Sequence, residues 1–234
     1  MNKKVITIFS FVFILSCSSS FSVSCSQNDK PVNEKNQAVS VKIKSIPYEM
    51  SFHNHPEKYE IIENNSIDIT SKAGTNLFNS PSGKYYKQDA PMLLFKPDSN
   101  FVFRAKITAE LEDIYDVAAL VLYQDDDYWA KLCFENSINK EATVVSVVTR
   151  RYSDDCNSIK IDGNYAFLSV AKNKNEFSFH CSKDGKNWEL IRHFRMEFSE
   201  NMRLGFAVHC SRGNGFSANF SSIQYSPVTL DEMR

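Results

Sequence analysis

Apolar and polar residues alternate along most of the chain between Val41 and Pro227, with the two-residue period of β-strands. The clearest case is Phe101–Leu111, where every second residue is apolar and most of the residues between are polar. Val117–Leu122 is apolar on both faces, as a central strand would be. No long segment keeps a helical period. Strands are therefore predicted at Tyr59–Ile62, Ser66–Thr70, Met92–Lys96, Phe101–Leu111, Val117–Gln124, Tyr128–Glu135, Thr143–Arg151, Ala166–Ala171, Glu176–Ser182, Trp188–Met196, Arg203–Cys210 and Phe216–Gln224.

Polar turn sequences separate these segments at Pro97–Asn100, Asp125–Asp127, Asp162–Gly163 and Asp184–Gly185. Many short strands with close spacing indicate an all-β protein built as an antiparallel sandwich or barrel. Roughly a dozen strands is more than an immunoglobulin-like domain needs. The predicted fold is therefore a two-sheet antiparallel β-sandwich of the jelly-roll type.

The N-terminal region has the pattern of a secretory signal, with Lys3 and Lys4 before the apolar run Val5–Leu15. Small residues precede Cys17 and Cys25, and both positions resemble a bacterial lipoprotein box; an ordinary cleaved signal is the alternative. We expect a lipoprotein-type signal peptide at 1–24, a flexible linker at 25–40, the sandwich at 41–228 and a C-terminal tail at 229–234. This predicts an exported protein held on a bacterial cell envelope by acyl chains at Cys25 or Cys17, with no spanning helix.

Charge and composition exclude several classes of protein. The formal net charge is -1 and no basic stripe is present, so nucleic acid is not expected as a partner. The five histidines lack metal-ligand spacing, and the seven glycines form no phosphate-binding loop, so neither a metal nor a cofactor is expected. A solvated turn is a better interpretation of Asp125–Asp127 than a calcium loop.

Four cysteines follow the predicted signal, and the signal predicts an oxidising compartment. The alternation of Phe177 and Phe179 with Cys181, and of Phe206 and Val208 with Cys210, points both thiols toward a core. Free buried cysteines are as consistent with this pattern as disulfides are. Four cysteines allow three pairings, and the spacing of Cys133, Cys156, Cys181 and Cys210 does not select one.

The most informative stretch consists of two long predicted strands, Asp127–Asn136 and Ala142–Asp155, which carry polar and aromatic groups together. Trp129, Lys131 and Glu135 share one face of the first strand. An indole ring beside donors and acceptors suits sugar recognition, so we predict a ligand-binding surface that also includes Arg151 and Asp154.

Two alternatives use the same residues. In the first, Lys131 and Glu135 form a solvated cross-strand network, Trp129 fills an edge of the sandwich, and the domain is a structural or protein-interaction module. In the second, Glu135 and either Asp154 or Asp155 act as the carboxylate pair of a glycoside hydrolase. Against catalysis, Lys131 beside Glu135 is expected to keep that carboxylate charged and so to oppose a general acid role. No catalytic residue is therefore assigned.

Several segments in the same order resemble the DUF1349 family, whose members adopt a concanavalin A-like lectin/glucanase sandwich. Asp127–Lys131 with Glu135 resembles its Trp-x-Lys...Glu strand, and Val145–Thr149 leading to Ser153-Asp154 resembles its Val-Val-Thr...Ser-Asp segment. Thr75–Phe78 is similar to its Thr-Asp-Phe-Trp segment. Phe52–Pro56 is similar to a reduced Trp-x-Asn-Pro-Pro.

The chain departs from that family pattern where Asn76 replaces an Asp, Phe78 replaces a Trp, and Asp155-Cys156 stands in place of Trp-Ser. Two fewer indoles would weaken an aromatic platform for sugars. The resemblance still implies a non-catalytic lectin that binds a carbohydrate or glycan at a cell envelope. The loop Asn76–Gln88 could leave the Trp129 face open or cover it, and both alternatives stand.

Overall fold

The computed structural model describes residues 40–228 and 230–234. The expected signal peptide (1–24), the lipidation candidates Cys17 and Cys25, and the expected linker up to residue 39 lie outside the described residues. Over the described part of the chain, no helix has the length and apolar character that a membrane crossing requires.

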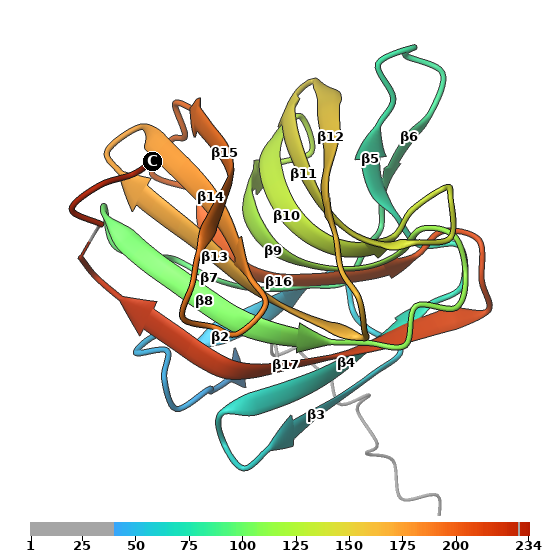
Figure 1. The fold of residues 1–234 in the computed structure, drawn as a ribbon, viewed down its shortest axis with the longest axis horizontal. Helices are drawn as coiled ribbons and strands as arrows, with labels where there is room; N and C mark the ends of the chain where they lie inside the picture. Colours follow the sequence, from blue (N-terminus) through green and yellow to red (C-terminus); the bar gives the residue numbers. More distant parts are fainter. Residues whose placement is uncertain (1–39, 229) are drawn as a thin grey trace, which may run out of the picture. The chain divides into compact units, whose positions relative to one another are not determined.

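The described residues form three antiparallel sheets, which we call sheet A, sheet B and the cover hairpin (Figure 1). Sheet A has eight strands in the order β1 (Ser40–Val41), β2 (Met50–His53), β7 (Met92–Phe95), β16 (Arg203–Cys210), β9 (Asp116–Asp125), β10 (Tyr128–Asn136), β11 (Ala142–Arg150) and β12 (Tyr152–Lys160). Sheet B has seven strands in the order β15 (Glu189–Arg195), β14 (Glu176–Ser182), β13 (Tyr165–Asn173), β8 (Phe101–Thr108), β17 (Gly215–Ser226), β4 (Ser66–Lys72) and β3 (Lys58–Ile62). The cover hairpin pairs β5 (Leu77–Asn79) with β6 (Tyr86–Gln88).

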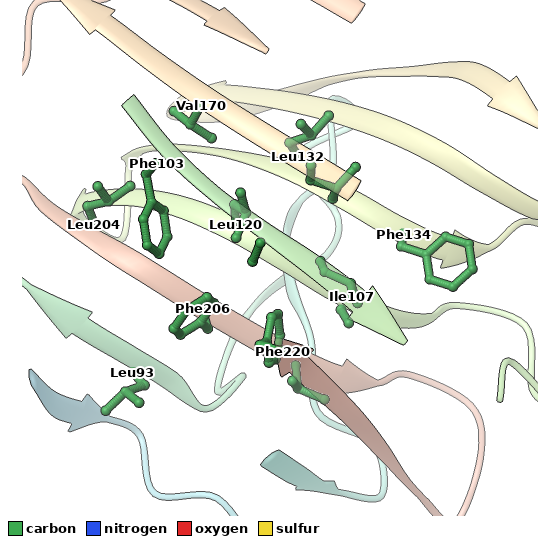
Figure 2. Close-up of a cluster of buried hydrophobic side chains, with 14 of the residues drawn as sticks. Leu93, Phe103, Ile107, Leu120, Leu132, Phe134, Val170, Leu204, Phe206 and Phe220 are labelled. Carbon is green, nitrogen blue, oxygen red and sulfur yellow. The ribbon is translucent and has the colours of Figure 1, made fainter. Parts of the chain in front are cut away.

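The main hydrophobic core lies between sheets A and B. Figure 2 shows Leu120 and Phe206 of sheet A among the same buried side chains as Phe103 and Phe220 of sheet B. The rings of Phe206 and Phe220 are 4.5 Å apart between centroids, and those of Phe103 and Phe206 are 5.3 Å apart. These contacts join the two layers, and the predicted two-sheet antiparallel sandwich is confirmed.

A second, smaller hydrophobic cluster lies on the outer face of sheet A, opposite the main core. It joins Val117, Ala119 and Val121 of β9 to Trp129 of β10 and Leu77 of the cover hairpin. This cluster explains why β9 is apolar on both faces: one face packs against sheet B and the other against residues near the cover hairpin. The prediction that Val117–Leu122 belongs to a central strand is confirmed, since β9 lies between β16 and β10.

Each of the twelve predicted segments contains a strand, but the expected long strand at Ala142–Asp155 is wrong. The chain turns at Arg151, whose φ of 69° places it in the left-handed region, and returns as β12. Most side chains of β12 are polar and exposed, so no apolar alternation marks it as a separate strand. The strands β1, β2, β5 and β6, of two to four residues each, were also not predicted.

The four described cysteines are free, and three of them, Cys133, Cys181 and Cys210, are buried. Cys181 and Cys210 belong to the main core, which confirms the predicted inward orientation of both. Burial raises the pKa of the Cys133 thiol to about 12 and that of Cys181 to about 11. These two thiols therefore act as small apolar core groups, not as nucleophiles.

Candidate functional site

A pocket of about 450 Å³ opens on the outer face of sheet A. Its floor comes from neighbouring strands and its walls from the loops beside them. The lining residues are Asn76, Phe78, Ser80, Tyr85, Tyr115, Val117, Lys131, Glu135, Val145, Val147, Asp155, His209, Ser211 and Arg212. The volume falls within the range of roughly 300–1,000 Å³ that is typical of small-molecule sites.

Strand alternation and register bring the charged groups of the floor together. Lys131 and Glu135 are four residues apart on β10 and therefore share a face. Val117 of β9 pairs with Glu135 on one side and with His209 of β16 on the other. Val147 of β11 likewise pairs with both Lys131 and Asp155. Groups from β10, β12 and β16 thus reach one pocket through single intervening valines.

The cover hairpin contributes to one wall of the pocket and is fixed by the side-chain amides of Asn79, which is buried, and Gln88, which is partly buried. The Asn79 side-chain amide donates to the Asp126 carbonyl at 2.9 Å and to the Arg151 carbonyl at 3.0 Å. The Gln88 amide donates to the same Asp126 carbonyl at 2.7 Å and to Asn79 Oδ1 at 2.6 Å. The solvated turn predicted at Asp125–Asp127 is therefore also the anchor of the hairpin.

Trp129 lies beneath this cover and is fully buried. Its indole Nε1 donates to the Asp126 carbonyl at 3.2 Å. Of the two alternatives for the Trp129 face, the structure therefore has the covered one. The expected open stacking surface at Trp129 is corrected to a packing role, because no face of the ring reaches solvent.

Lys131 lies at the bottom of the pocket with only 3% of its surface exposed. Its Nζ donates to the Leu77 carbonyl at 2.9 Å and lies 2.9 Å from His209 Nε2. Burial, and secondarily the Lys131 ammonium, hold the pKa of His209 well below its usual value. His209 is therefore neutral and its Nε2 accepts a hydrogen bond from the Lys131 ammonium, while Nδ1 lies 3.5 Å from Ser211 Oγ.

Glu135 is buried at the other end of the floor, and its pKa is raised from 4.5 to about 7. Desolvation is the main cause; Lys131 acts in the opposite direction, and Asp155 adds to the rise. The expectation that Lys131 keeps this carboxylate fully charged is therefore wrong, because burial outweighs the neighbouring ammonium. Near neutral pH the Glu135 side chain can either donate or accept a hydrogen bond.

Aromatic rings and a guanidinium form the rim. Tyr85, in the loop between β5 and β6, is 44% exposed, and its hydroxyl accepts a hydrogen bond from Asn76 Nδ2 at 3.2 Å. The Arg212 guanidinium lies 5.1 Å from the centroid of the Tyr115 ring. Phe78 lines the pocket as well. Ring faces are therefore available from these residues and not from Trp129.

Of the five predicted ligand-binding residues, the structure brings Lys131 and Glu135 to the pocket and leaves Arg151 and Asp154 outside its lining. Asp154 forms an ion pair with Arg192 of sheet B at 3.1 Å. Arg151 lies in the turn before β12, with its guanidinium 5.5 Å from the Tyr152 ring. Arg151 and Asp154 lie outside the pocket lining because that turn reverses the chain between Thr149 and Ser153.

Sequence reasoning missed His209, Tyr115, Tyr85 and Arg212 as members of this site. His209 was detectable, because Phe206 and Val208 point into the core and the alternate residues must face outward. The other three come from loops whose position no local pattern reveals. In the described part of the chain, no group of three His, Cys, Asp or Glu side chains is arranged to hold a metal ion.

Comparison with known proteins gives relatives in yeast and in bacteria. The chain is 23% identical over 161 residues to the "Regulation of enolase protein 1" of Saccharomyces cerevisiae, which covers 68% of this chain and 80% of the yeast protein. A solved structure of a functionally unknown protein from Saccharomyces cerevisiae superposes with a TM-score of 0.72 at 21% identity, over 77% of this chain and 97% of that one.

Two bacterial glycoside hydrolases share the fold over part of their length. The GH43 BlXynB protein of Bacillus licheniformis has a TM-score of 0.60 at 15% identity, over 77% of this chain and 37% of that one. The xyloglucan PUL GH43B protein of Bacteroides ovatus has a TM-score of 0.61 at 14% identity, over 77% and 36% respectively. The chain thus spans little more than a third of these two enzymes, and the likeness concerns the fold alone.

A family model described as "Protein of unknown function (DUF1349)" matches residues 52–228, which include both sheets from β3 onward and every residue that lines the pocket. The match covers more than half of the chain, and the chain belongs to the DUF1349 family.

Proposed function

We propose that the protein is a non-catalytic carbohydrate-binding module of a cell envelope, and that the pocket on the outer face of sheet A holds the sugar. The mixture of groups around the pocket carries this proposal. Tyr85 and Tyr115 supply ring faces, Lys131 supplies a donor, and Glu135 and Asp155 supply acceptors. Sugar rings present apolar C–H faces and a ring of hydroxyls, and therefore need both kinds of group.

Two further observations support the proposal. A β-sandwich of this kind is compatible with carbohydrate binding, and part of two glycoside hydrolases has the same fold. The N-terminal pattern, with its signal and its lipidation candidates Cys17 and Cys25, would put such a module on a cell surface, near glycans. Fold likeness alone does not imply function, so the pocket chemistry carries the greater weight.

Replacing Tyr85 by alanine is expected to weaken sugar binding about fivefold, since stacking on one ring is worth on the order of 1 kcal/mol. Tyr85→Ala leaves the fold intact because the side chain is 44% exposed and outside both hydrophobic clusters. The measurement is a screen of the purified protein against soluble oligosaccharides, followed by titration calorimetry of the best ligand.

The matched control is Tyr86→Ala. Tyr86 is the next residue, is also 44% exposed, and lies outside the lining of this pocket. The Tyr86→Ala variant should bind the sugar with unchanged affinity. Equal losses in the two variants would show that the pocket is not the site. Failure of the folded wild-type protein to bind any sugar would favour the structural or protein-interaction alternative.

A glycoside hydrolase is the second candidate, and one observation favours it. The buried Glu135 has a pKa of about 7, which suits a general acid or base near neutral pH, and Asp155 lines the same pocket as a second carboxyl group. If this candidate is right, Glu135→Gln abolishes turnover of a bound oligosaccharide and retains its affinity. If the binding proposal is right, the wild-type protein releases no reducing sugar from any ligand that it binds.

A further inference from the structure

The pocket gathers two cations and two carboxyl groups that have no ion-pair partner. Lys131, Arg212, Glu135 and Asp155 all line it. None of them lies within 4.0 Å of an oppositely charged group among residues 40–228 and 230–234, where the ion pairs involve other side chains. The fold therefore holds charges of both signs around one cavity without joining them to each other.

The Lys131 ammonium is the most unusual of these charges. It is almost completely buried, and its two acceptors, the Leu77 carbonyl and the neutral His209 ring, carry no formal charge. An ammonium has three donors, and beyond these two acceptors Nζ lies 5.7 Å from the centroid of the Trp129 ring, which carries no formal charge either. Buried charges in proteins are normally paired, because desolvation without a counter-charge is costly. An anionic group in the pocket would supply that charge.

Arg212 provides a second cation at the rim of the same cavity. Its guanidinium lies near the Tyr115 ring, 5.1 Å from the centroid, and is exposed. The planar fork of a guanidinium matches the two oxygens of a carboxylate better than it matches a single hydroxyl. One cation is therefore buried and point-like, and the other is planar and reachable from solvent.

The two carboxyl groups suit a different part of the ligand. Neither Glu135 nor Asp155 has a side-chain hydrogen bond to any described residue, and both border the cavity. Carboxyl oxygens accept hydrogen bonds from the hydroxyls of a sugar. A ligand that satisfies all four groups carries one carboxylate and several hydroxyls on a compact ring.

We infer that the ligand is an acidic sugar, a uronic acid or a glycan that bears one. Lys131 and Arg212 bind its carboxylate, and Glu135 and Asp155 accept hydrogen bonds from its hydroxyls. This inference rests on the proposed carbohydrate-binding function and specifies the chemical class of the sugar. Tyr85 and Tyr115 then contact the ring, as they would for a neutral sugar.

The test compares three probes of equal length by titration calorimetry with the purified protein: uronic-acid oligosaccharides (galacturonate and glucuronate series), their methyl esters, and the corresponding neutral oligosaccharides. The ester removes the charge of the acid and adds one methyl group, and the neutral sugar lacks the carboxyl group altogether. We expect the acid to bind at least about tenfold more tightly than its ester and than the neutral sugar, which is the scale of a desolvated charge pair.

Single substitutions test which residues cause the preference for the acid. Lys131→Met should reduce the affinity for the acid about tenfold or more and leave the affinity for the ester within about threefold. Because Lys131 is buried, its variant could lose stability, so Arg212→Gln at the exposed rim is the second test and should weaken binding of the acid selectively. Arg151→Gln is the matched control: it removes the same charge outside the pocket lining and should change neither affinity.

Three results overturn the inference. Equal binding of acid and ester, or tighter binding of the neutral sugar, refutes the acidic ligand and leaves the proposed carbohydrate binding intact. If Arg151→Gln abolishes the preference for the acid and Arg212→Gln preserves it, the carboxylate of the ligand binds outside this pocket. Absence of binding by folded protein to all three probes also refutes the acidic ligand, and the screen against soluble oligosaccharides then decides the proposed function separately.

Discussion

Replacing Trp129 by alanine is expected to lower the free energy of unfolding by about 3–5 kcal/mol, the scale for removal of a fully buried large aromatic side chain. The indole is fully buried between β10 and the cover hairpin, and its N–H bonds the Asp126 carbonyl. Asn79 and Gln88 bond that same carbonyl, so the cavity left by the substitution would also loosen the pocket wall. Urea denaturation followed by far-ultraviolet circular dichroism measures the loss.

The other tryptophan of the chain is the matched control. Trp188 is only partly buried and stacks on Arg104, whose guanidinium is 4.7 Å from the ring centroid. Its alanine variant should lose about 1 kcal/mol, which is the scale of a partly solvated cation–π contact. If Trp129→Ala had wild-type stability and lost only sugar binding, the ring would be an exposed stacking platform after all, and its packing role would be refuted.

Replacing Glu135 by glutamine is expected to stabilise the protein at pH 8. The pKa of this carboxyl is about 7 in the folded state, above its ordinary value of 4.5. The folded protein therefore holds the proton more tightly than the unfolded chain does. The resulting stabilisation is complete below pH 4.5 and is lost as the pH rises through 7, with an upper limit of about 3 kcal/mol. Glutamine keeps the shape of the side chain and does not ionise, so the variant does not lose this stabilisation as the pH rises.

The measurement is the free energy of unfolding of both proteins in urea at several values between pH 5 and pH 8. The difference should be small at pH 5 and should grow toward pH 8 in favour of the variant. Glu141→Gln is the control, since Glu141 only forms a surface ion pair with Lys160 that is worth about 0–1 kcal/mol. A variant that is less stable than the wild type at pH 8 would mean that Glu135 supports the fold as an ion.

The alternation of apolar residues was sufficient to predict the two-sheet sandwich, because residues two apart share a face of a strand. The same rule placed Lys131 and Glu135 together on β10. It did not place Trp129 correctly, because burial of the outer face depends on a hairpin about fifty residues away in sequence. Leu77 and Asn79 reach that face through buried side-chain and packing contacts that carry no local signal.

Two other parts of the site depended on features that the sequence pattern hides. The turn at Arg151 occupies a single residue in a left-handed conformation, and the polar strand after it has no apolar period. This turn decides that Asp155 borders the pocket and that Asp154 pairs with sheet B. The pKa of Glu135 depended on the depth of burial, which the neighbouring Lys131 alone did not indicate.

Along β10, residues that pack into the main core alternate with residues on the opposite face of the sheet, two of which line the pocket. Ala130, Leu132 and Phe134 pack into the main core, whereas Lys131 and Glu135 face the pocket. Under the proposed function, substitutions of Lys131 and Glu135 can therefore change the preferred ligand without altering the side chains of the main core. The functionally unknown yeast protein shares only 21% of its residues with this chain and still superposes with a TM-score of 0.72, so the fold tolerates extensive substitution. Under that proposal, ligand preference should be compared between relatives at the positions of Lys131 and Glu135.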